Sequence, residues 1–380
     1  MKVKFNILLG MILFCFSCNN IEKQENLGKT YFVDLQKETN PFEEIFSKVE
    51  VIPLETTDSG LIVYCNKIFP INDKLYIYDD WSLKLLAFNQ TGEFEFQVGR
   101  KGQGPGEYLN MYDCIIDPAS NNISILESYG RILQYDLNGK HKETIKLPSL
   151  PNYFALATIN DNNWVTWSAL EIEEDCIYVL DESATNTIIS YWKDDRMFNM
   201  NQQHPFFNYD GKVYFGVGLR QQVYEVTTSG LIPAYLWDFG PDNIKKSRLE
   251  YYLGIDHPSK RNKKIIDDIG TAEMPFVLEN QYQNKTYSYV ALRRETGIRP
   301  SFTHVLYNKK KNASFVFNTL DGNECKMNVP LYFGDDYLLV DVLYDNREAY
   351  KSILSESEHK KLEAMKEDDN PCLLKLYFKK

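Results

Sequence analysis

The repeat begins with the segments Leu75-Tyr-Ile-Tyr-Asp79, Lys84-Leu-Leu-Ala-Phe88 and Asn89-Gln-Thr-Gly92. It recurs as Ile123-Ser-Ile-Leu-Glu127, Arg131-Ile-Leu-Gln-Tyr135 and Asp136-Leu-Asn-Gly139, at offsets of 47 or 48 residues. Each copy holds two runs rich in β-branched and aromatic residues, and an Asn/Asp-x-x-Gly turn follows the second run. The pattern predicts a repeated unit of short antiparallel strands.

The same repeat continues along the chain, but its later copies are less similar in sequence. Later units contain the runs Trp164–Trp167, Cys176–Leu180 and Thr187–Trp192, then Asp210–Phe215, Gln222–Val226 and Tyr235–Phe239, then Pro275–Leu278, Thr286–Val290, Thr303–Tyr307 and Ala313–Phe317. Four short antiparallel strands in roughly 40 to 50 residues is typical of a β-propeller blade. We therefore predict an all-β fold of the propeller type.

The last blade needs strands from both ends of the chain. Tyr337–Asp341 and Cys372–Phe378 are strand candidates near the C-terminus, and Val49–Leu54 precedes the first complete unit. If these segments share one sheet, the ring closes and no long unpaired edge remains. Pro53 fits an outer position because it has no N–H to donate.

Two stretches interrupt the β pattern and predict small helical insertions. Asp242–Tyr252 begins with a candidate N-cap, and Asn346–Lys366 contains the capping box formed by Ser355 and Glu358. We expect both to pack over one face or over a blade edge.

The overall charge argues against nucleic acid as a partner. The chain has 380 residues, with 42 Lys and Arg against 53 Asp and Glu, so its net charge is −11. The basic cluster Lys260-Arg-Asn-Lys-Lys264 is interpreted as a solvated loop. Aromatic residues make up 14% of the chain, which favours β structure.

The N-terminus resembles a lipoprotein signal. Lys2 and Lys4 precede the apolar run Ile7–Phe16, which is too short to span a bilayer as a helix. Ser17 stands directly before Cys18, and a small residue in front of a cysteine is what lipoprotein signal peptidases accept. Cys18 is therefore the predicted lipidation site; an ordinary secretory signal is the alternative.

These features predict three segments. Residues 1–17 would be the signal peptide, 18–48 the lipidated cysteine and a tether, and 49–380 the propeller. Cys15 departs from the usual lipobox, in which a leucine stands three residues before the modified cysteine. Processing at Cys18 would then be slower, or another site would be used.

No motif for a metal, a cofactor or a reaction is found. The remaining cysteines have wide spacings and no C-x-x-C pair: Cys65, Cys114, Cys176, Cys325 and Cys372. The five histidines are scattered, and no G-x-S-x-G motif is present. We expect buried free thiols, no metal and no cofactor.

A glycine-rich segment, Val98-Gly-Arg-Lys-Gly-Gln-Gly-Pro-Gly-Glu-Tyr108, follows the first blade. Together with Val51–Glu55 and Asp368–Leu374, it resembles the six-bladed, NHL-like β-propeller lipoproteins in the envelopes of gut-dwelling Gram-negative anaerobes. The resemblance covers nearly all of the mature chain. It implies six blades and an envelope location, and it implies no reaction.

The glycine-rich segment is also the candidate ligand site. As a connection between blades it needs its glycines, whereas its charged and aromatic residues exceed that need. The candidate ligand-binding residues are Arg100, Lys101, Gln103, Glu107 and Tyr108. Arg100 would bind an anionic or hydroxyl group and Tyr108 would stack. The alternative is that Arg100 and Glu107 pair internally and bridge adjacent blades.

The sequence thus predicts a binding or scaffolding propeller, lipid-anchored to the outer membrane on an undetermined side. Its ligand would be a glycan, a peptide or a partner protein of the envelope. The alternative is a lyase or hydrolase with a site in the central channel, which rests on analogy between folds.

Overall fold

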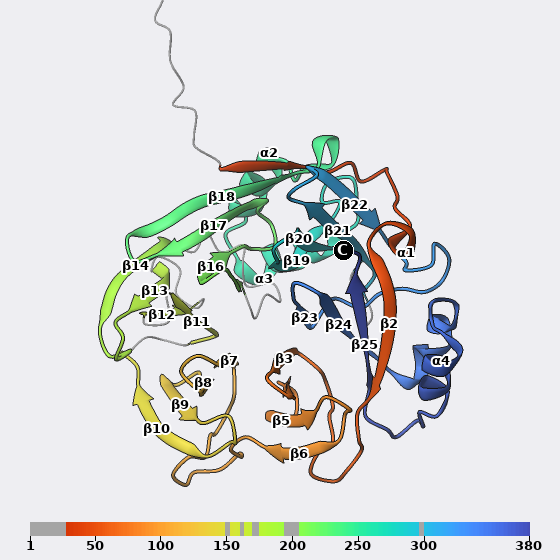
Figure 1. Ribbon diagram of the computed structural model, residues 1–380. Helices are drawn as coiled ribbons and strands as arrows, with labels where there is room; N and C mark the ends of the chain where they lie inside the picture. The colour runs from red at the N-terminus through yellow and green to blue at the C-terminus, as the bar shows by residue number, and fades with distance from the viewer. Residues whose placement is uncertain (1–27, 149–152, 160–162, 169–174, 194–204, 296–299) are drawn as a thin grey trace, which may run out of the picture.

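The computed structural model describes residues 28–380, apart from 149–152, 160–162, 169–174, 194–204 and 296–299. Six β-sheets surround a central axis and form a six-bladed β-propeller (Figure 1). Five sheets have four strands and one has five. The predicted fold class is confirmed.

Blades 1 to 3 each consist of four consecutive antiparallel strands. Blade 1 contains β3 (Lys67–Ile71), β4 (Lys74–Asp79), β5 (Lys84–Asn89) and β6 (Phe94–Gln97). Blade 2 contains β7 (Asp113–Asp117), β8 (Asn122–Glu127), β9 (Arg131–Tyr135) and β10 (His141–Lys146). Blade 3 contains β11 (Ala155–Ile159), β12 (Asn163–Trp167), β13 (Asp175–Leu180) and β14 (Thr187–Lys193).

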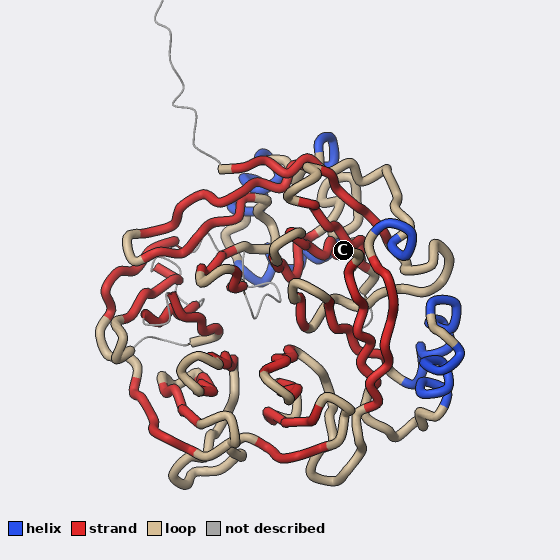
Figure 2. Tube along the Cα trace, viewed as in Figure 1, coloured by secondary structure: helices blue, strands red, loops and turns tan. Residues whose placement is uncertain are grey.

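Blades 4 to 6 take in the rest of the strands. Blade 4 contains β15 (Phe206–Tyr209), β16 (Lys212–Phe215), β17 (Gln222–Thr227) and β18 (Gly230–Asp238). Blade 5 contains β19 (Val277–Gln283), β20 (Tyr287–Arg293), β21 (Phe302–Asn308) and β22 (Ala313–Phe317). Blade 6 contains β23 (Tyr332–Phe333), β24 (Tyr337–Val342), β25 (Cys372–Phe378) and β2 (Phe46–Pro53). In each blade the first strand lies nearest the axis and the last at the rim (Figure 2).

The two ends of the chain close the ring within blade 6, as predicted. β2 pairs with β25 in antiparallel register from Phe46 opposite Phe378 to Pro53 opposite Cys372. β2 is the outermost strand of this sheet, so the missing N–H of Pro53 breaks no ladder.

The segment before β2 is part of the folded domain, and we call residues 29–53 the N-terminal belt. β1 (Lys29–Phe32) pairs in parallel with β18 as a fifth strand of blade 4. The chain then passes blade 5, where Thr39 N donates to Val316 O at 2.7 Å, and α1 (Pro41–Glu44) leads into β2. The belt therefore joins the rims of three blades.

The strands of the propeller start before the expected boundary at residue 49, because β1 begins at Lys29 and β2 at Phe46. The side chains of Tyr31, Val33 and Leu35 are buried between blades 4 and 5. Thr30, Asp34 and Gln36 alternate with these buried residues and are polar, as expected for an edge strand, whereas Phe32 in the same series is exposed.

The core consists of six hydrophobic clusters, one at each contact between neighbouring blades. Successive side chains of a strand point to opposite faces of the sheet, so each blade packs against both neighbours. Leu85 of β5, for example, belongs to the cluster between blades 1 and 2, and the adjacent Leu86 belongs to the cluster between blades 6 and 1.

The first helical insertion joins β18 to β19 and contains η1 (Gly240–Asp242), α2 (Lys246–Leu253) and α3 (Pro258–Asp268). We call it the α2–α3 insertion. The basic cluster predicted to be a loop lies inside α3, because Pro258 starts a helix whose Arg261 and Ile265 are buried. Arg261 Nε donates to Tyr252 O at 2.8 Å, so this arginine is structural.

The second insertion joins β24 to β25 and contains η2 (Tyr344–Ile353) and α4 (Glu356–Glu363). Ser355 caps α4 by accepting from Glu358 N at 3.4 Å. The Glu358 carboxylate accepts from Val51 N at 2.6 Å, which satisfies an edge donor of β2. Among the described helices, none has the length and apolar character needed to cross a bilayer.

Candidate functional site

The two faces of the ring differ because their connections differ. The connections from the first to the second strand and from the third to the fourth are tight polar turns, such as Asn72-Asp73 in blade 1. The remaining connections, between blades and between the second and third strands, emerge on the other face because the strands are antiparallel. The connections between blades are the longer ones, this side carries both helical insertions, and we call it the loop face.

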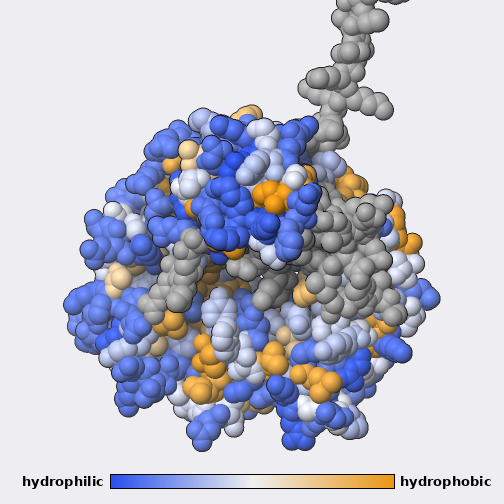
Figure 3. Space-filling model, turned by 180° about the vertical axis from the view of Figure 1, so that it is seen from behind, coloured by the Kyte–Doolittle hydropathy of each residue, from blue (hydrophilic) through white to orange (hydrophobic). Residues whose placement is uncertain are grey.

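Exposed hydrophobic side chains are concentrated on the loop face. Fourteen large hydrophobic residues are exposed in the described part of the chain; Phe32, Ile188 and Ile232 are in outer strands, and the other eleven are in loop-face connections. Those eleven are Leu61, Val63, Tyr64, Trp81, Leu109, Tyr112, Tyr129, Tyr251, Leu253, Ile266 and Leu343. Figure 3, which views the ring from behind Figure 1, shows hydrophobic residues scattered across this side.

Trp81 and Tyr129 are the most exposed of these side chains, at 79% and 78%. They occupy the same position in blades 1 and 2, each two residues after the last residue of the second strand. Tyr64 and Tyr112 precede the inner strands of the same two blades. We call these four residues the aromatic patch.

Buried carboxylates fix the backbone under this patch. Asp79 ends β4 and accepts from Val63 N at 2.7 Å and from Trp81 N at 3.0 Å. Glu127 ends β8 and accepts from Leu109 N at 2.6 Å. Each carboxylate thus holds the connection that enters its own blade, and hydrogen bonds to an ionised acceptor are strong.

The glycine-rich connection between β6 and β7 closes on itself. Glu107 Oε1 lies 2.6 Å from Arg100 Nε, and Glu107 Oε2 accepts from Gly104 N at 2.8 Å. The Gly104 N–H and then the Arg100 guanidinium lower the pKa of Glu107. A Cβ at Gly102 would lie 2.0 Å from Glu107 Oε2, so a larger residue there would displace this carboxylate. The Arg100 and Glu107 pair lies within one connection and does not bridge two blades.

Tyr108 is fully buried and therefore cannot stack on a ligand, which corrects that prediction. Its hydroxyl donates to Leu83 O at 3.0 Å, in blade 1. Tyr135 of blade 2 donates to Gly106 O at 3.0 Å, so tyrosine hydroxyls fasten the connection to both blades. A buried tyrosine hydroxyl usually finds such a partner.

The five predicted ligand residues thus divide into two groups. Glu107 and Tyr108 have structural contacts, whereas Lys101 and Gln103 are exposed at the edge of the connection and Arg100 is exposed there while paired with Glu107. Cys18 lies outside the described residues.

Charged groups near the axis are paired with one another. Lys67 Nζ lies 2.5 Å from Asp113 Oδ1, and Asp113 Oδ2 accepts from Leu156 N at 2.9 Å, which links blades 1, 2 and 3. In blade 5, Glu279 Oε1 lies 3.0 Å from Arg293 Nε, and burial raises the pKa of Glu279. These contacts stabilise the inner ends of the blades.

In the part of the chain that the structure describes, no group of three or more His, Cys, Asp or Glu side chains is placed to hold a metal ion. The five cysteines from Cys65 to Cys372 are buried free thiols, as expected.

The sequence analysis missed the aromatic patch. A signal for it was present in the aligned repeat, where Trp81 follows Asp79 at the same distance as Tyr129 follows Glu127. Exposure, however, depends on where the connection points, and a repeat alignment does not give that direction.

Solved structures support the fold. The chain is similar to a Bacteroides fragilis protein thought to be exported, with 18% identity and a TM-score of 0.75 over 93% of this chain and 100% of that one. It is also similar to a DUF4221 family member from Bacteroides vulgatus, with 11% identity and a TM-score of 0.55 over 88% of this chain and 98% of that one. At these identities the likeness concerns architecture alone. No curated protein matches the chain.

The resemblance found in the sequence is confirmed for the six-bladed propeller, while its lipoprotein and NHL-like parts stay predictions. Residues 30–377 match the domain of unknown function DUF4934. The match spans the N-terminal belt and all six blades. The chain belongs to the DUF4934 family.

Proposed function

We propose that this protein is an exported binding or scaffolding module, held at the cell envelope through a lipid on Cys18, whose ligand docks on the aromatic patch. The observation that carries the proposal is the segregation of exposed hydrophobic side chains, eleven of fourteen on the loop face. Exposed hydrophobic side chains gathered on one face of a domain commonly mark an interaction site.

The composition of the patch supports a glycan, a peptide or a protein surface as the ligand. Trp and Tyr combine a flat apolar face with a hydrogen-bonding group and lose little conformational entropy on binding. Arg100, Lys101 and Gln103 lie in the same connection as Tyr112 and would supply polar contacts at its edge. Because Asp79 and Glu127 hold the backbone beneath, the rings need little reorganisation before binding.

A glycan array and a peptide array, each probed with labelled protein, test the proposal. We expect the double variant Trp81→Ala with Tyr129→Ala to lose about tenfold or more in affinity for whatever the wild type binds, with an unchanged melting temperature. The matched control replaces two exposed residues of outer strands, Ile188→Ala with Ile232→Ala, and should bind as the wild type does. Equal binding by all three proteins would exclude the aromatic patch as the site.

A further inference from the structure

The place where the chain enters the domain lies beside the α2–α3 insertion. β1 pairs with β18 up to Phe32 opposite Asp238, and α2 begins eight residues after Asp238. In Figure 1, β1 and α2 lie on the same outer side of the ring. Gly28 is the tenth residue after Cys18, so a lipid on Cys18 would hold this rim within about 35 Å of the bilayer.

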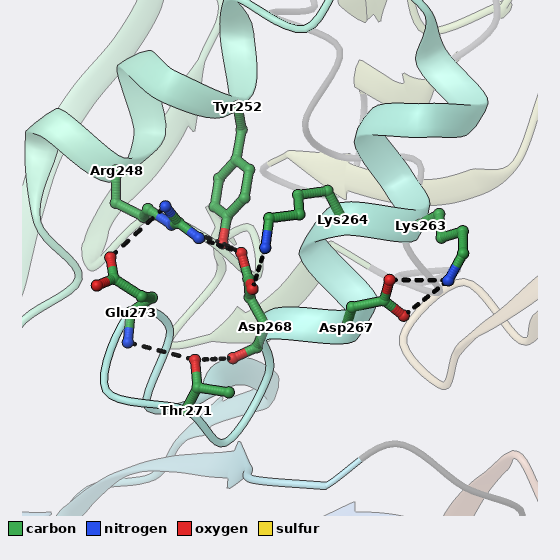
Figure 4. Close-up of polar contacts among 8 residues, drawn as sticks. All are labelled: Arg248, Tyr252, Lys263, Lys264, Asp267, Asp268, Thr271 and Glu273. Atoms are coloured by element: carbon green, nitrogen blue, oxygen red, sulfur yellow. Dashed lines mark hydrogen bonds and ion pairs between the residues drawn. The ribbon is translucent and has the colours of Figure 1, made fainter.

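A polar network centred on Asp268 fixes the insertion as a rigid element (Figure 4). Tyr252 Oη donates to Asp268 Oδ2 at 2.8 Å, Lys264 Nζ lies 2.7 Å from Asp268 Oδ1, and Arg248 pairs with the same carboxylate. Burial alone would raise the pKa of Asp268, but hydrogen bonds from these three side chains hold it below its ordinary value. The two helices therefore keep one relative placement.

The surface around this network is apolar and carries exposed lysines. Phe32 is 68% exposed, and three side chains of the insertion are exposed as well: Tyr251, Leu253 and Ile266. Residues 240–276 hold seven Lys and Arg against six Asp and Glu, but Arg261 is buried, so the surface of the insertion is close to neutral in a chain whose net charge is −11. Lys245 and Lys246 stand at the start of α2, and the closest carboxylate to Lys246 Nζ is 3.9 Å away, on Glu250.

We infer that Phe32 and the α2–α3 insertion rest on an anionic bilayer surface when the chain is anchored through Cys18. The inference rests on the proposed lipid anchor. Aromatic and aliphatic side chains would enter the interface, and lysines would face anionic headgroups, as in other interfacial helices. The remainder of the acidic domain would be repelled from such a surface, so the insertion is the part suited to approach it.

This orientation leaves the proposed ligand site accessible. In a ring of six blades, blades 1 and 2 lie across the axis from blades 4 and 5 (Figure 1). The aromatic patch shares the loop face with the insertion but lies on the opposite side of the ring, so a ring tilted onto the insertion would hold the patch off the bilayer, where a ligand could reach it.

Hydrogen exchange on vesicles tests the inference. A chain starting at Cys18 keeps every described residue, and its other cysteines are buried, so Cys18 can be coupled to a maleimide lipid. On vesicles of phosphatidylethanolamine and phosphatidylglycerol, we expect amides of residues 245–268 to exchange about threefold more slowly than in the uncoupled protein. On phosphatidylcholine vesicles the difference should be much smaller.

Charge reversal supplies the matched comparison. Lys245→Glu with Lys246→Glu should abolish the slower exchange, whereas Lys140→Glu with Lys146→Glu, in and beside the outer strand of blade 2, should leave it unchanged. Exchange in the insertion that is equal on anionic vesicles and in solution would overturn the inference. So would protection confined to blades 1 and 2. Since the coupling supplies the anchor, failure of native lipidation would affect only the proposed function.

Discussion

Phe46 and Phe378 are register partners across the seam between the two ends of the chain, and their ring centroids lie 5.6 Å apart. Phe378 also contacts Tyr287 of blade 5, at a centroid distance of 5.2 Å. One terminal side chain thus takes part both in the sheet that closes the ring and in the packing of that sheet on its neighbour. Stability of the ring should depend on the terminal strand.

Truncation after Asn370 should therefore unfold the whole domain. It removes β25 and the buried side chains of Leu373, Leu374 and Leu376, each worth roughly 1.5 to 3 kcal/mol, against a typical total of about 5 to 15 kcal/mol. The measurement is thermal unfolding followed by circular dichroism. Removal of Lys380 alone is the control. A truncated protein with the parental melting temperature would show that the shared blade does not close the ring.

The N-terminal belt gives a second stability prediction. The ring of Tyr31 lies 4.2 Å from that of Tyr307 and 4.6 Å from that of Tyr235, between blades 4 and 5. Tyr31→Ala should lower the free energy of unfolding by roughly 3 kcal/mol, the usual effect of removing a buried aromatic ring. The adjacent Phe32→Ala removes an exposed ring and should change it by less than about 0.5 kcal/mol. Equal effects in urea titrations would contradict the packing described for β1.

The parts of the fold that follow from local patterns were predictable. Strand runs, turn residues and the Ser355 cap are short-range signals, and the repeat at 47 or 48 residues multiplies them. β1 was missed because its partner strand is some two hundred residues away in sequence. Arg261 was assigned to a solvated loop because charged residues are rarely buried without a partner, and its partner, Tyr252 O, belongs to another helix.

The candidate site was less predictable, because the contacts of its residues also depend on partners elsewhere in the chain. Glu107 accepts hydrogen bonds, as expected, but from within its own connection, and Tyr108, expected to stack on a ligand, is buried and donates to Leu83 O instead. Whether a side chain meets protein or solvent depends on neighbouring blades, which a single blade's sequence does not describe.

A third prediction concerns the loop formed by Glu107. Glu107→Ala removes the acceptor shared by Arg100 Nε and Gly104 N, so the connection should open locally while the blades stay folded. We expect trypsin to cleave faster after Arg100 and Lys101, with little change in melting temperature. The control is Glu95→Ala. Glu95 lies in β6, the strand before this connection, and forms a surface ion pair with Lys74. Identical cleavage rates in the wild type and both variants would show that Glu107 does not hold the connection closed.

His304 should make stability depend on pH. It is buried; its Nε2 donates to Met327 O at 3.0 Å, since a carbonyl can only accept, and its Nδ1 accepts from Tyr289 Oη at 2.8 Å. Burial lowers its pKa from 6.5 to about 4. Between these values the unfolded chain binds the extra proton and the folded chain does not, so stability is lost as pH falls from about 6.5 to about 4.

The shift in the pKa of His304 corresponds to a loss of roughly 3 kcal/mol in the free energy of unfolding across that pH range. His304→Gln should remove it, so the wild type should lose that much more stability than the variant between pH 7 and pH 4. Urea titrations at several pH values measure the difference. Parallel pH profiles would mean that His304 titrates alike in the folded and unfolded chains.

The last prediction concerns anchoring. The apolar run up to Phe16 and the Ser17-Cys18 junction predict that the mature protein fractionates with membranes and is released only by detergent. Cys18→Ala removes the thiol that would carry the lipid, so this variant should not be processed to an acylated form. Cys15→Leu restores the residue usual in a lipobox and should be processed at least as fast as the wild type. Mass spectrometry of the N-terminal peptide, with fractionation of the same cells, distinguishes the outcomes. Wild type and Cys18→Ala in the same fraction, with no acyl mass on Cys18, would leave an ordinary secretory signal as the explanation of the N-terminus.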